Sequence, residues 1–296
     1  MYLFILPSLV LTLIFAYLPM FTNIIAFMDY DLFKGWMGFG SRFIGFANFS
    51  RIFSDPYFFT LLKRTLYYGF GLIVFTFPAS LVLALLFNEI SNNRIKTTMQ
   101  TISYIPRFIS WVTVGGLIYI FLSVDQSGLV NNIKQYLFGG DRILFMQQPA
   151  AFFPILTIAN IWKWIGWGTI LYNAAISAID PQRYEAAKVD GANRWQLVRY
   201  VTLPGILPTT AILLIFQLGT VMGGNFEAIF NLQNPVIRHD TNTIAIYVYY
   251  KGITEGQYAL SSAVALFNGF ASFLLVMISN FISKRVAGVS FFGRIS

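Results

Sequence analysis

Residues 180–204 read DPQRYEAAKVDGANRWQLVRYVTLP and stand between two long apolar stretches. Asp180 is a good N-cap and Pro181 suits the first helical position, so a helix is expected to begin here. Gly191 can adopt the left-handed conformation that ends a helix. This stretch therefore predicts a short helix that stops at a sharp turn.

A second short helix is expected after the turn, because Asn193 and Gln196 have the spacing of a capping box. Before the turn, Ala186 and Ala187 leave little side chain on the first helix, so another protein can approach it closely. The residues predict a polar helical hairpin that serves either as a docking element or as an ordinary connection between membrane helices.

The chain around the hairpin is apolar, since 56% of its 296 residues are hydrophobic and only 11% are charged. Soluble domains carry about a quarter charged residues. A spanning helix needs about 20 apolar residues, and runs of this length favour helices over barrel strands. We expect an all-α membrane protein with about six transmembrane helices in one transmembrane domain, residues 1–296. The expected spans are residues 1–28, 65–88, 108–124, 143–179, 200–226 and 256–283.

The composition also excludes several kinds of chemistry. The chain has no cysteine and a single histidine, His239, so thiolate and two-histidine metal motifs are impossible. We expect neither catalytic residues nor a metal site. No G-x-x-x-x-G-K-[S/T] loop is present to hold the phosphates of ATP. On a chain this apolar, the net charge of +8 indicates lipid headgroups and cytoplasmic loops rather than nucleic acid.

Six spans would place both termini on one side of the membrane. Lys and Arg favour cytoplasmic loops, but here they divide almost evenly between the two sides. Lys284 and Arg285 directly follow the last span and favour termini in the cytoplasm. Residues 1–28 carry no charge and lead to no small-residue cleavage site, so we expect a retained membrane helix and not a signal peptide.

The hairpin resembles the EAA motif of importer-type ABC permeases, E-A-A-x-x-x-G followed by L-P. The matching, ATPase-coupling residues are Glu185, Ala186, Ala187, Asp190, Gly191, Ala192, Leu203 and Pro204. In that family the loop is cytoplasmic and docks into a cleft of the ATPase subunit. The resemblance implies the type I permease fold, with this coupling hairpin between helices 4 and 5.

The same resemblance implies a set of partners. They are a second homologous permease, two ATPase subunits and an extracytoplasmic solute-binding protein. ATP and Mg would be held by the ATPase subunits, and no cofactor is expected on this chain. Closure of the ATPase pair would move the hairpin and drive alternating access.

Further stretches are similar to the polysaccharide and oligosaccharide permeases of the carbohydrate-uptake branch. They are Leu6-Pro7, Tyr17-x-Pro19, Gly45-Phe-x-Asn48-Phe49, Asp55-Pro56, Pro106-x-Phe108-Ile-Ser110-Trp111-Val112, Trp162-Lys163-x-x-Gly166-Trp167-Gly168, Phe226-Glu227, Asn234-Pro235, Tyr247-Val248-Tyr249 and Gly256-Gln257-Tyr258. The chain departs from that branch at Ala245-Ile246 and at Tyr250, where the branch usually has Asp-Thr and Arg. This resemblance implies import of an oligo- or polysaccharide.

Polar and aromatic side chains inside the expected spans are candidates for the substrate pathway, because such groups usually face a cavity or a partner. The candidates are Asn160, Lys163, Trp164, Trp167, Gln217, Asn225, Glu227 and Asn268. Aromatic rings stack on sugar faces, and amides both donate and accept hydrogen bonds. Plainer roles compete: Lys163 can pair with a helix end, the tryptophans can anchor at the interface, and the amides can hold helices together.

An acidic polysaccharide such as alginate is favoured by Lys163 and the basic residues of the outer loops, and neutral oligosaccharides remain an equal alternative. The outer segments are expected at residues 29–61, 125–142 and 231–257. A short interfacial helix is predicted within residues 49–64. Of these segments, 231–257 is the preferred contact for a solute-binding protein.

Glycines in the fifth expected span suggest both packing and flexibility. Gly219 and Gly223 have the spacing that lets helices approach closely. The pair Gly223-Gly224 would also loosen the span where a pathway must open. Alanine at both positions is therefore predicted to reduce transport.

Two other classes of protein compete with the importer permease. An ion-coupled secondary carrier would explain the apolar spans, Lys163 and Glu227. It would not explain the pattern of residues 185–191, and paired inverted repeats are not evident. A membrane-bound sugar transferase would need paired acidic residues, and Asp29 and Asp31 form the only close pair.

Overall fold

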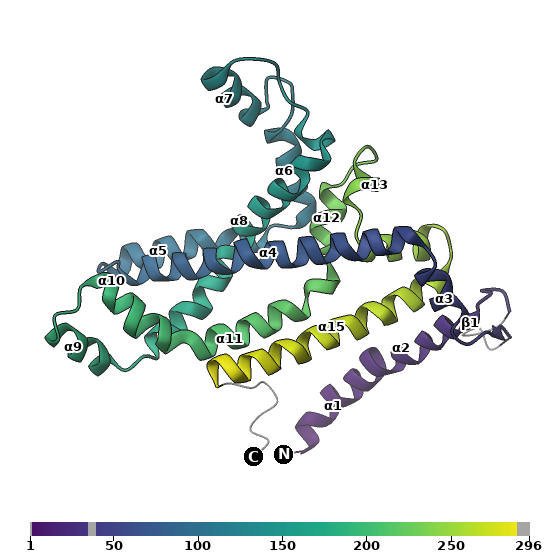
Figure 1. The fold of residues 1–296 in the computed structure, drawn as a ribbon, viewed down its shortest axis with the longest axis horizontal. Helices are drawn as coiled ribbons and strands as arrows, with labels where there is room; N and C mark the ends of the chain where they lie inside the picture. The colour runs from purple at the N-terminus through teal and green to yellow at the C-terminus, as the bar shows by residue number, and fades with distance from the viewer. Residues whose placement is uncertain (1, 35–39, 289–296) are drawn as a thin grey trace. The chain divides into compact units, whose positions relative to one another are not determined.

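The computed structural model describes residues 2–34 and 40–288, and almost all of its regular structure is helical, as Figure 1 shows. The predicted all-α fold is confirmed, with one small exception described below. Residues 35–39 of the predicted outer segment 29–61 lie outside the described residues, as does the end of the C-terminal tail. The chain forms two compact units, residues 1–65 with 242–271 and residues 66–241 with 272–296.

The first unit combines the N-terminal segment with the start of the last helix. Its elements are α1 (Tyr2–Thr12), a π-helical turn (Leu13–Tyr17), α2 (Leu18–Met20), a 3-10 helix (Phe21–Phe27), β1 (Met28–Asp29), β2 (Arg42–Phe43), α3 (Ala47–Phe53), the beginning of α4 (Pro56–Asn88), α14 (Ile244–Tyr249), a second π-helical turn (Tyr250–Thr254) and the beginning of α15 (Tyr258–Ala287). The sequence did not predict β1 and β2, which pair antiparallel with Met28 opposite Phe43.

Buried side-chain hydrogen bonds hold this unit together. The side chain of Asn48 donates to the backbone oxygens of Ala26, at 2.9 Å, and of Met28, at 3.0 Å. The hydroxyl of Thr65 accepts from the amide of Ile244 at 3.0 Å. These contacts satisfy backbone groups that would otherwise be buried without partners.

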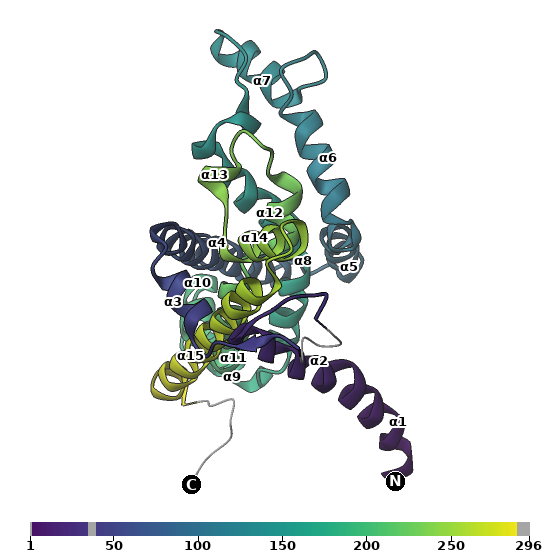
Figure 2. The same ribbon diagram turned by 90° about the vertical axis from the view of Figure 1, so that its right-hand side faces the viewer.

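The second unit contains most of the chain. Its elements are the rest of α4, α5 (Asn93–Tyr104), a 3-10 turn (Ile105–Phe108), α6 (Trp111–Phe121), α7 (Leu129–Phe138), a 3-10 turn (Phe145–Gln147), α8 (Pro149–Ser177), α9 (Pro181–Val189), α10 (Arg194–Leu197), a π-helical turn (Val198–Thr202), α11 (Leu203–Gly219), a 3-10 turn (Val221–Gly223), α12 (Phe226–Leu232), α13 (Arg238–Thr241) and the end of α15. Figure 2 shows α6 leading from the end of α5 to α7.

Helix α8 packs closely against both α4 and α5 because it presents glycine at the contacts. A Cβ atom on Gly166 would lie 2.2 Å from the backbone oxygen of Ser103 in α5. A Cβ atom on Gly168 would lie 2.4 Å from the hydroxyl of Ser80 in α4. Thr169 adds a hydrogen bond to the backbone oxygen of Ser80 at 3.2 Å. These contacts fix the helices around which the cavity described below is built.

Among the described residues, four helical segments are long and apolar enough to cross a membrane, and a bent pair would make a fifth if it forms one span. The four segments are Ile5–Phe27, Pro56–Asn88, Arg194–Gly223 and Tyr258–Arg285. Helix α8 has 29 residues and is not among these segments; it carries Asn160, Lys163 and Thr169 among its buried residues. The expected total of six spans is therefore not confirmed.

Two boundaries differ from the sequence prediction. Residues 93–108 and 111–121 form two helices at 98° to each other, where the sequence predicted one span at 108–124. Helix α4 begins at Pro56, so the second half of the predicted interfacial helix is part of this long helix, and α3 alone stands before it. Of Gly219 and Gly223, only Gly219 is at a close contact: its Cβ would lie 3.0 Å from Val276.

Candidate functional site

The predicted hairpin is present, with the caps that the sequence indicated. Asp180 accepts a hydrogen bond from the amide of Gln182 at 2.9 Å, and α9 starts at Pro181. Gly191 has φ +79°, the left-handed conformation that favours glycine. The predicted helix, turn and N-cap are therefore confirmed.

The capping box after the turn is also confirmed. Gln196 donates its amide N–H to Oδ1 of Asn193 at 2.9 Å, and its own Oε1 accepts from the amide of Asn193 at 2.7 Å. Helix α10 does not end as a separate short helix, however. It continues through the π-helical turn into α11, so the hairpin joins that long helix without a break.

Buried contacts fasten the base of the hairpin. The hydroxyls of Tyr184 and Thr202 lie 2.9 Å apart and join its two arms. Leu203 packs at the edge of a buried cluster that contains Ile179 and Ile206. A Cβ on Gly205 would lie 2.7 Å from Ile179, so this glycine lets the arms approach closely. The base is thus fixed, and motion of the hairpin would be passed to α8 and α11.

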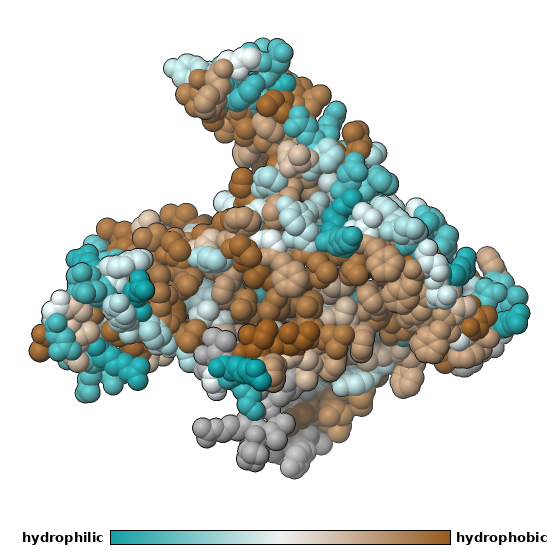
Figure 3. Space-filling view, viewed as in Figure 1, coloured by the Kyte–Doolittle hydropathy of each residue, from teal (hydrophilic) through white to brown (hydrophobic). Residues whose placement is uncertain are grey.

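The tip of the hairpin is open to its surroundings. Glu185, Ala186 and Asp190 are exposed, while Ala187 and Ala192 are half-buried. The largest apolar side chain there, Trp195, is 70% exposed. Figure 3 shows hydrophilic residues over the end of the molecule that carries α9 and α10. An exposed Trp beside small alanines suits a docking surface.

A cavity of about 500 Å³ lies among α4, α8, α11 and the turn that follows α11. It is lined by Gly69, Leu72, Ile73, Thr76, Phe77, Ser80, Asn160, Trp164, Trp167, Gly168, Leu171, Tyr172, Leu213, Phe216, Gln217, Thr220, Val221, Gly224 and Asn225. Five of the predicted pathway residues are among these, namely Asn160, Trp164, Trp167, Gln217 and Asn225. The cavity thus combines aromatic faces with amides and hydroxyls, the groups that suit a sugar.

A break in the helix shapes one wall of this cavity. Helix α11 ends at Gly219, and Gly224 and Asn225 follow with φ values of +61° and +52°. The side-chain amide of Asn225 donates to Oδ1 of Asn160 at 2.5 Å. Asn160 in turn donates to the backbone oxygen of Leu156 at 2.8 Å. The break is therefore tied to α8 by a chain of hydrogen bonds.

The sequence reading missed the contribution of α4 to the cavity. Thr76 and Ser80 line it, and their spacing of four residues puts both on one face of the helix. The same apolar span also contains Phe77, whose ring meets the ring of Tyr172 edge to face, with the ring centres 5.9 Å apart. Two hydroxyl residues four positions apart in an apolar helix are the signal that could have identified this wall.

Lys163 does not line the cavity. Its side chain is 4% exposed, and its ammonium donates to the backbone oxygens of Arg107, at 3.3 Å, and of Ile109. It also lies 5.4 Å from the ring centre of Trp111. These contacts place Lys163 at the bend between α5 and α6, where the first helix ends and leaves carbonyl groups without helical partners.

The last two predicted pathway residues lie elsewhere. Glu227 is exposed in the first turn of α12, and its backbone oxygen accepts from the side chain of Asn231 at 2.7 Å. Asn268 is a half-buried residue of α15 in the first unit and is not among the residues that line the cavity.

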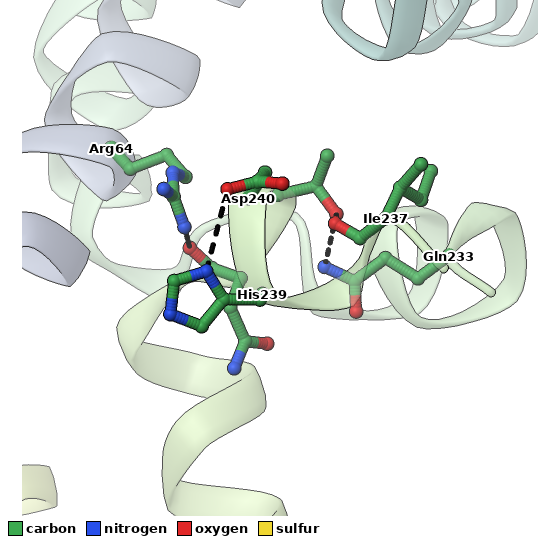
Figure 4. A network of polar contacts seen from close by, with 7 residues as sticks. Arg64, Gln233, Ile237, His239 and Asp240 are labelled. Atoms are coloured by element: carbon green, nitrogen blue, oxygen red, sulfur yellow. Dashed lines mark hydrogen bonds and ion pairs between the residues drawn. The ribbon is translucent and has the colours of Figure 1, made fainter. Parts of the chain in front are cut away.

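The expected outer segments are rich in polar contacts. In segment 125–142, hydroxyl groups of Ser127 and Ser123 donate to Asp125 and hold the pKa of its carboxyl below the usual value of 3.8. In segment 231–257, Gln233 donates to the hydroxyl of Thr241 at 3.0 Å (Figure 4). The backbone oxygen of Asn242, in the same segment, accepts a hydrogen bond from Arg64 of α4 at 3.2 Å, also drawn in Figure 4.

Apolar helices, a cavity lined by aromatic rings, amides and hydroxyls, and an exposed hairpin together are typical of a membrane transport permease. Residues 76–288 match the family described as binding-protein-dependent transport system inner membrane component, and the chain belongs to this family. It is therefore a component of the inner membrane and works with a binding protein. Its function is transport, as a permease subunit of an ABC importer and not as an enzyme.

Relatives and solved structures agree with this assignment. The chain is 41% identical to the polygalacturonan/rhamnogalacturonan transport system permease YteP of Bacillus subtilis, over 96% of this chain and 88% of YteP. It is 39% identical to LplB of the same organism, with the same two coverages. A bacterial transporter that imports the acidic polysaccharide alginate matches with a TM-score of 0.87 and 37% identity, covering 96% of this chain and 95% of that one.

A bacterial alginate ABC transporter in complex with a periplasmic protein that holds an alginate pentasaccharide is also similar. That structure matches with a TM-score of 0.88 and 37% identity, over 98% of this chain and 95% of that chain. These likenesses confirm the predicted type I permease fold. The family assignment also decides against the ion-coupled carrier and the sugar transferase.

Proposed function

We propose that this chain forms half of the membrane pathway for an acidic oligo- or polysaccharide, and that a separate ATPase drives it through the α9–α10 hairpin. The observation that carries the proposal is the connection between hairpin and cavity. Helix α8 leads from Asn160 and Trp164 at the cavity to Asp180 at the start of the hairpin. Helix α11 leads from Pro204 at its end back to Gln217 at the cavity.

The two helices that flank the hairpin are thus the two that supply most of the predicted pathway residues. A displacement of the hairpin tip would be transmitted along α8 and α11 and would move the walls of the cavity. Alternating access needs such an element with different contacts in two states. In the proposed cycle, Glu185, Ala186, Ala187, Asp190, Gly191 and Ala192 dock on the ATPase, and Leu203 and Pro204 carry the motion into α11.

The remaining parts of the importer are proposed on the same basis. A second permease of similar fold would complete the pathway, and two ATPase subunits would hold ATP and Mg. A solute-binding protein would deliver the saccharide at the outer segments, with segment 231–257 as its preferred contact. Both termini and the hairpin would then lie in the cytoplasm.

A solved structure favours an acidic saccharide, and the lining of the cavity favours a saccharide in general. A solved transporter that resembles this chain over nearly its whole length imports acidic alginate. The cavity itself offers Trp164 and Trp167 for stacking and three amides for hydroxyl groups. Stacking with these rings suits any sugar face, so the residue that senses the acidic group must be a different one.

The test is uptake by liposomes that contain the complete transporter and its binding protein. Labelled uronate oligosaccharides should accumulate with ATP and not with an ion gradient alone. Because the chain has no cysteine, Val189→Cys gives a single label at a position that is 87% exposed. A membrane-impermeant maleimide should reach it only from the ATPase side. Uptake without ATP, or labelling from the opposite side, would contradict the proposal.

A further inference from the structure

Arg107 lies at the bend between α5 and α6, beside the tryptophans of the cavity. Its guanidinium carbon is 3.9 Å from the ring centre of Trp164 and 5.7 Å from that of Trp167. Both rings line the cavity; Arg107 is not among the lining residues and borders the cavity through its contacts with these two rings. Trp164 stands halfway along the 29 residues of α8, so this cation is far from either end of that helix.

Arg107 is half-buried here, and a charged group removed from water is costly unless something compensates it. Within the part of the chain that the structure describes, no carboxylate forms an ion pair with Arg107. Its Nε is buried and has no hydrogen-bond partner among these residues. Stacking on Trp164 offsets only part of the desolvation cost, since a cation over an aromatic ring contributes about 0.5–2 kcal/mol.

The other cation at the bend is already occupied. Lys163 donates to the backbone oxygen of Arg107 itself and to that of Ile109. It therefore holds the bend that presents Arg107 and is not available for a ligand. Glu227 acts on Lys163 electrostatically but forms no ion pair with it in the described part of the chain.

A fixed cation next to stacking rings matches one chemical class of ligand. The guanidinium can donate two parallel hydrogen bonds to a carboxylate. The indole rings can cover the face of the sugar ring that bears it. The amides of Asn160, Gln217 and Asn225 can bind its hydroxyl groups, since all three line the same cavity.

We propose that Arg107 is the residue that selects uronate units, and that Lys163 is the positioning residue that holds the Arg107 backbone at the bend. This inference rests on the proposed function and adds the group that distinguishes an acidic from a neutral saccharide. A carboxylate in the cavity would pair with the guanidinium while its sugar ring stacks on the face of Trp164 that the guanidinium leaves free. A neutral sugar would make the stacking contact alone.

The experiment compares two oligosaccharides of equal length in the reconstituted transporter, one with uronate carboxylates and one in which these are reduced to alcohols. In Arg107→Gln the charge is lost and the planar end group is kept. The ratio of kcat/KM for the acidic substrate to kcat/KM for the reduced substrate should fall about tenfold, since only the acidic substrate can form a charged hydrogen bond with Arg107. Uptake of the reduced substrate should change less than threefold, because its stacking contact remains.

Arg94→Gln is the matched control, because Arg94 is an exposed arginine at the start of α5, whereas Arg107 is half-buried against the tryptophans of the cavity. It should leave the preference unchanged. If Arg107→Gln does not assemble, Arg107→Met takes its place with the same expectation. A variant that slows both substrates equally would show a structural role only and overturn the proposal. If the wild-type transporter takes up neither saccharide, the proposed function fails instead.

Discussion

The hairpin and the cavity are made in opposite ways, although α8 and α11 belong to both. The hairpin is specified locally, since Asp180, Gly191 and the Asn193–Gln196 pair each act within a few residues. The cavity is assembled from α4, α8, α11 and a helix break that are far apart in the chain. The comparison teaches that a capped hairpin can be read from sequence directly, while a cavity needs the packing of several helices.

The sharpest way to break the hairpin is Gly191→Val, which should have the largest effect. No atom lies within 4 Å of the added Cβ, so the change creates no clash. The cost comes from φ +79°, where a β-branched residue is strained by about 2 kcal/mol. That strain would reduce the docking conformation roughly thirtyfold.

Uptake by the Gly191→Val transporter should therefore fall more than tenfold, while the isolated ATPase remains active. The measurement is saccharide uptake per ATP hydrolysed. Gly191→Asn is the control, because asparagine tolerates the left-handed conformation. Normal uptake by Gly191→Val would mean that the turn is not needed for coupling.

The contrast between the two regions explains which residues the sequence revealed. The caps of the hairpin follow rules that depend on near neighbours, so the prediction of both helix starts was correct. Trp164 and Asn160 could be found because polar and aromatic residues are conspicuous in a span. Arg107 could not be assigned, because its place depends on the 98° bend and on a contact with a helix more than 50 residues away.

Other elements show the same limit. The short strands β1 and β2 escaped prediction because a two-residue strand has no periodicity to detect. Lys163 was a candidate for substrate contact, and only the structure shows that it caps the carbonyl groups of the bend. The sequence had offered this plainer role as an alternative, but nothing local could decide between the two.

The packing that creates the cavity can be tested at Gly166. A Cβ there would lie 2.2 Å from the backbone oxygen of Ser103, which cannot move without shifting α5. Overpacking of this kind costs roughly 1–3 kcal/mol. In Gly166→Ala we expect a lower unfolding temperature and a several-fold loss of uptake.

The control for this substitution is Gly116→Ala in α6, where no atom lies within 4 Å of the new Cβ. It should keep the unfolding temperature of the wild type or raise it slightly, since alanine favours a helix. Thermal unfolding of the purified complex gives both values. Equal stability of Gly166→Ala and wild type would show that α5 can move away from α8 freely.

The smallest effect is expected at the helix break, where the two adjacent glycines should behave differently. Gly224 has φ +61°, so alanine there is strained by about 1–2 kcal/mol. Gly223 has an ordinary φ and open space around its Cβ position, so alanine should cost almost nothing. From the sequence, Gly223 and Gly224 were expected to loosen the span together, so alanine at both positions was predicted to reduce transport.

The structure sharpens that prediction into a comparison of single substitutions. Gly224→Ala should reduce uptake a few-fold, because the strain disturbs the bond between Asn225 and Asn160 at 2.5 Å. Gly223→Ala should transport like the wild type, and both should assemble normally, as measured by recovery of the intact complex. If Gly223→Ala impairs uptake as much as Gly224→Ala, the break acts through general flexibility. The left-handed turn that holds the cavity wall would then not be the cause.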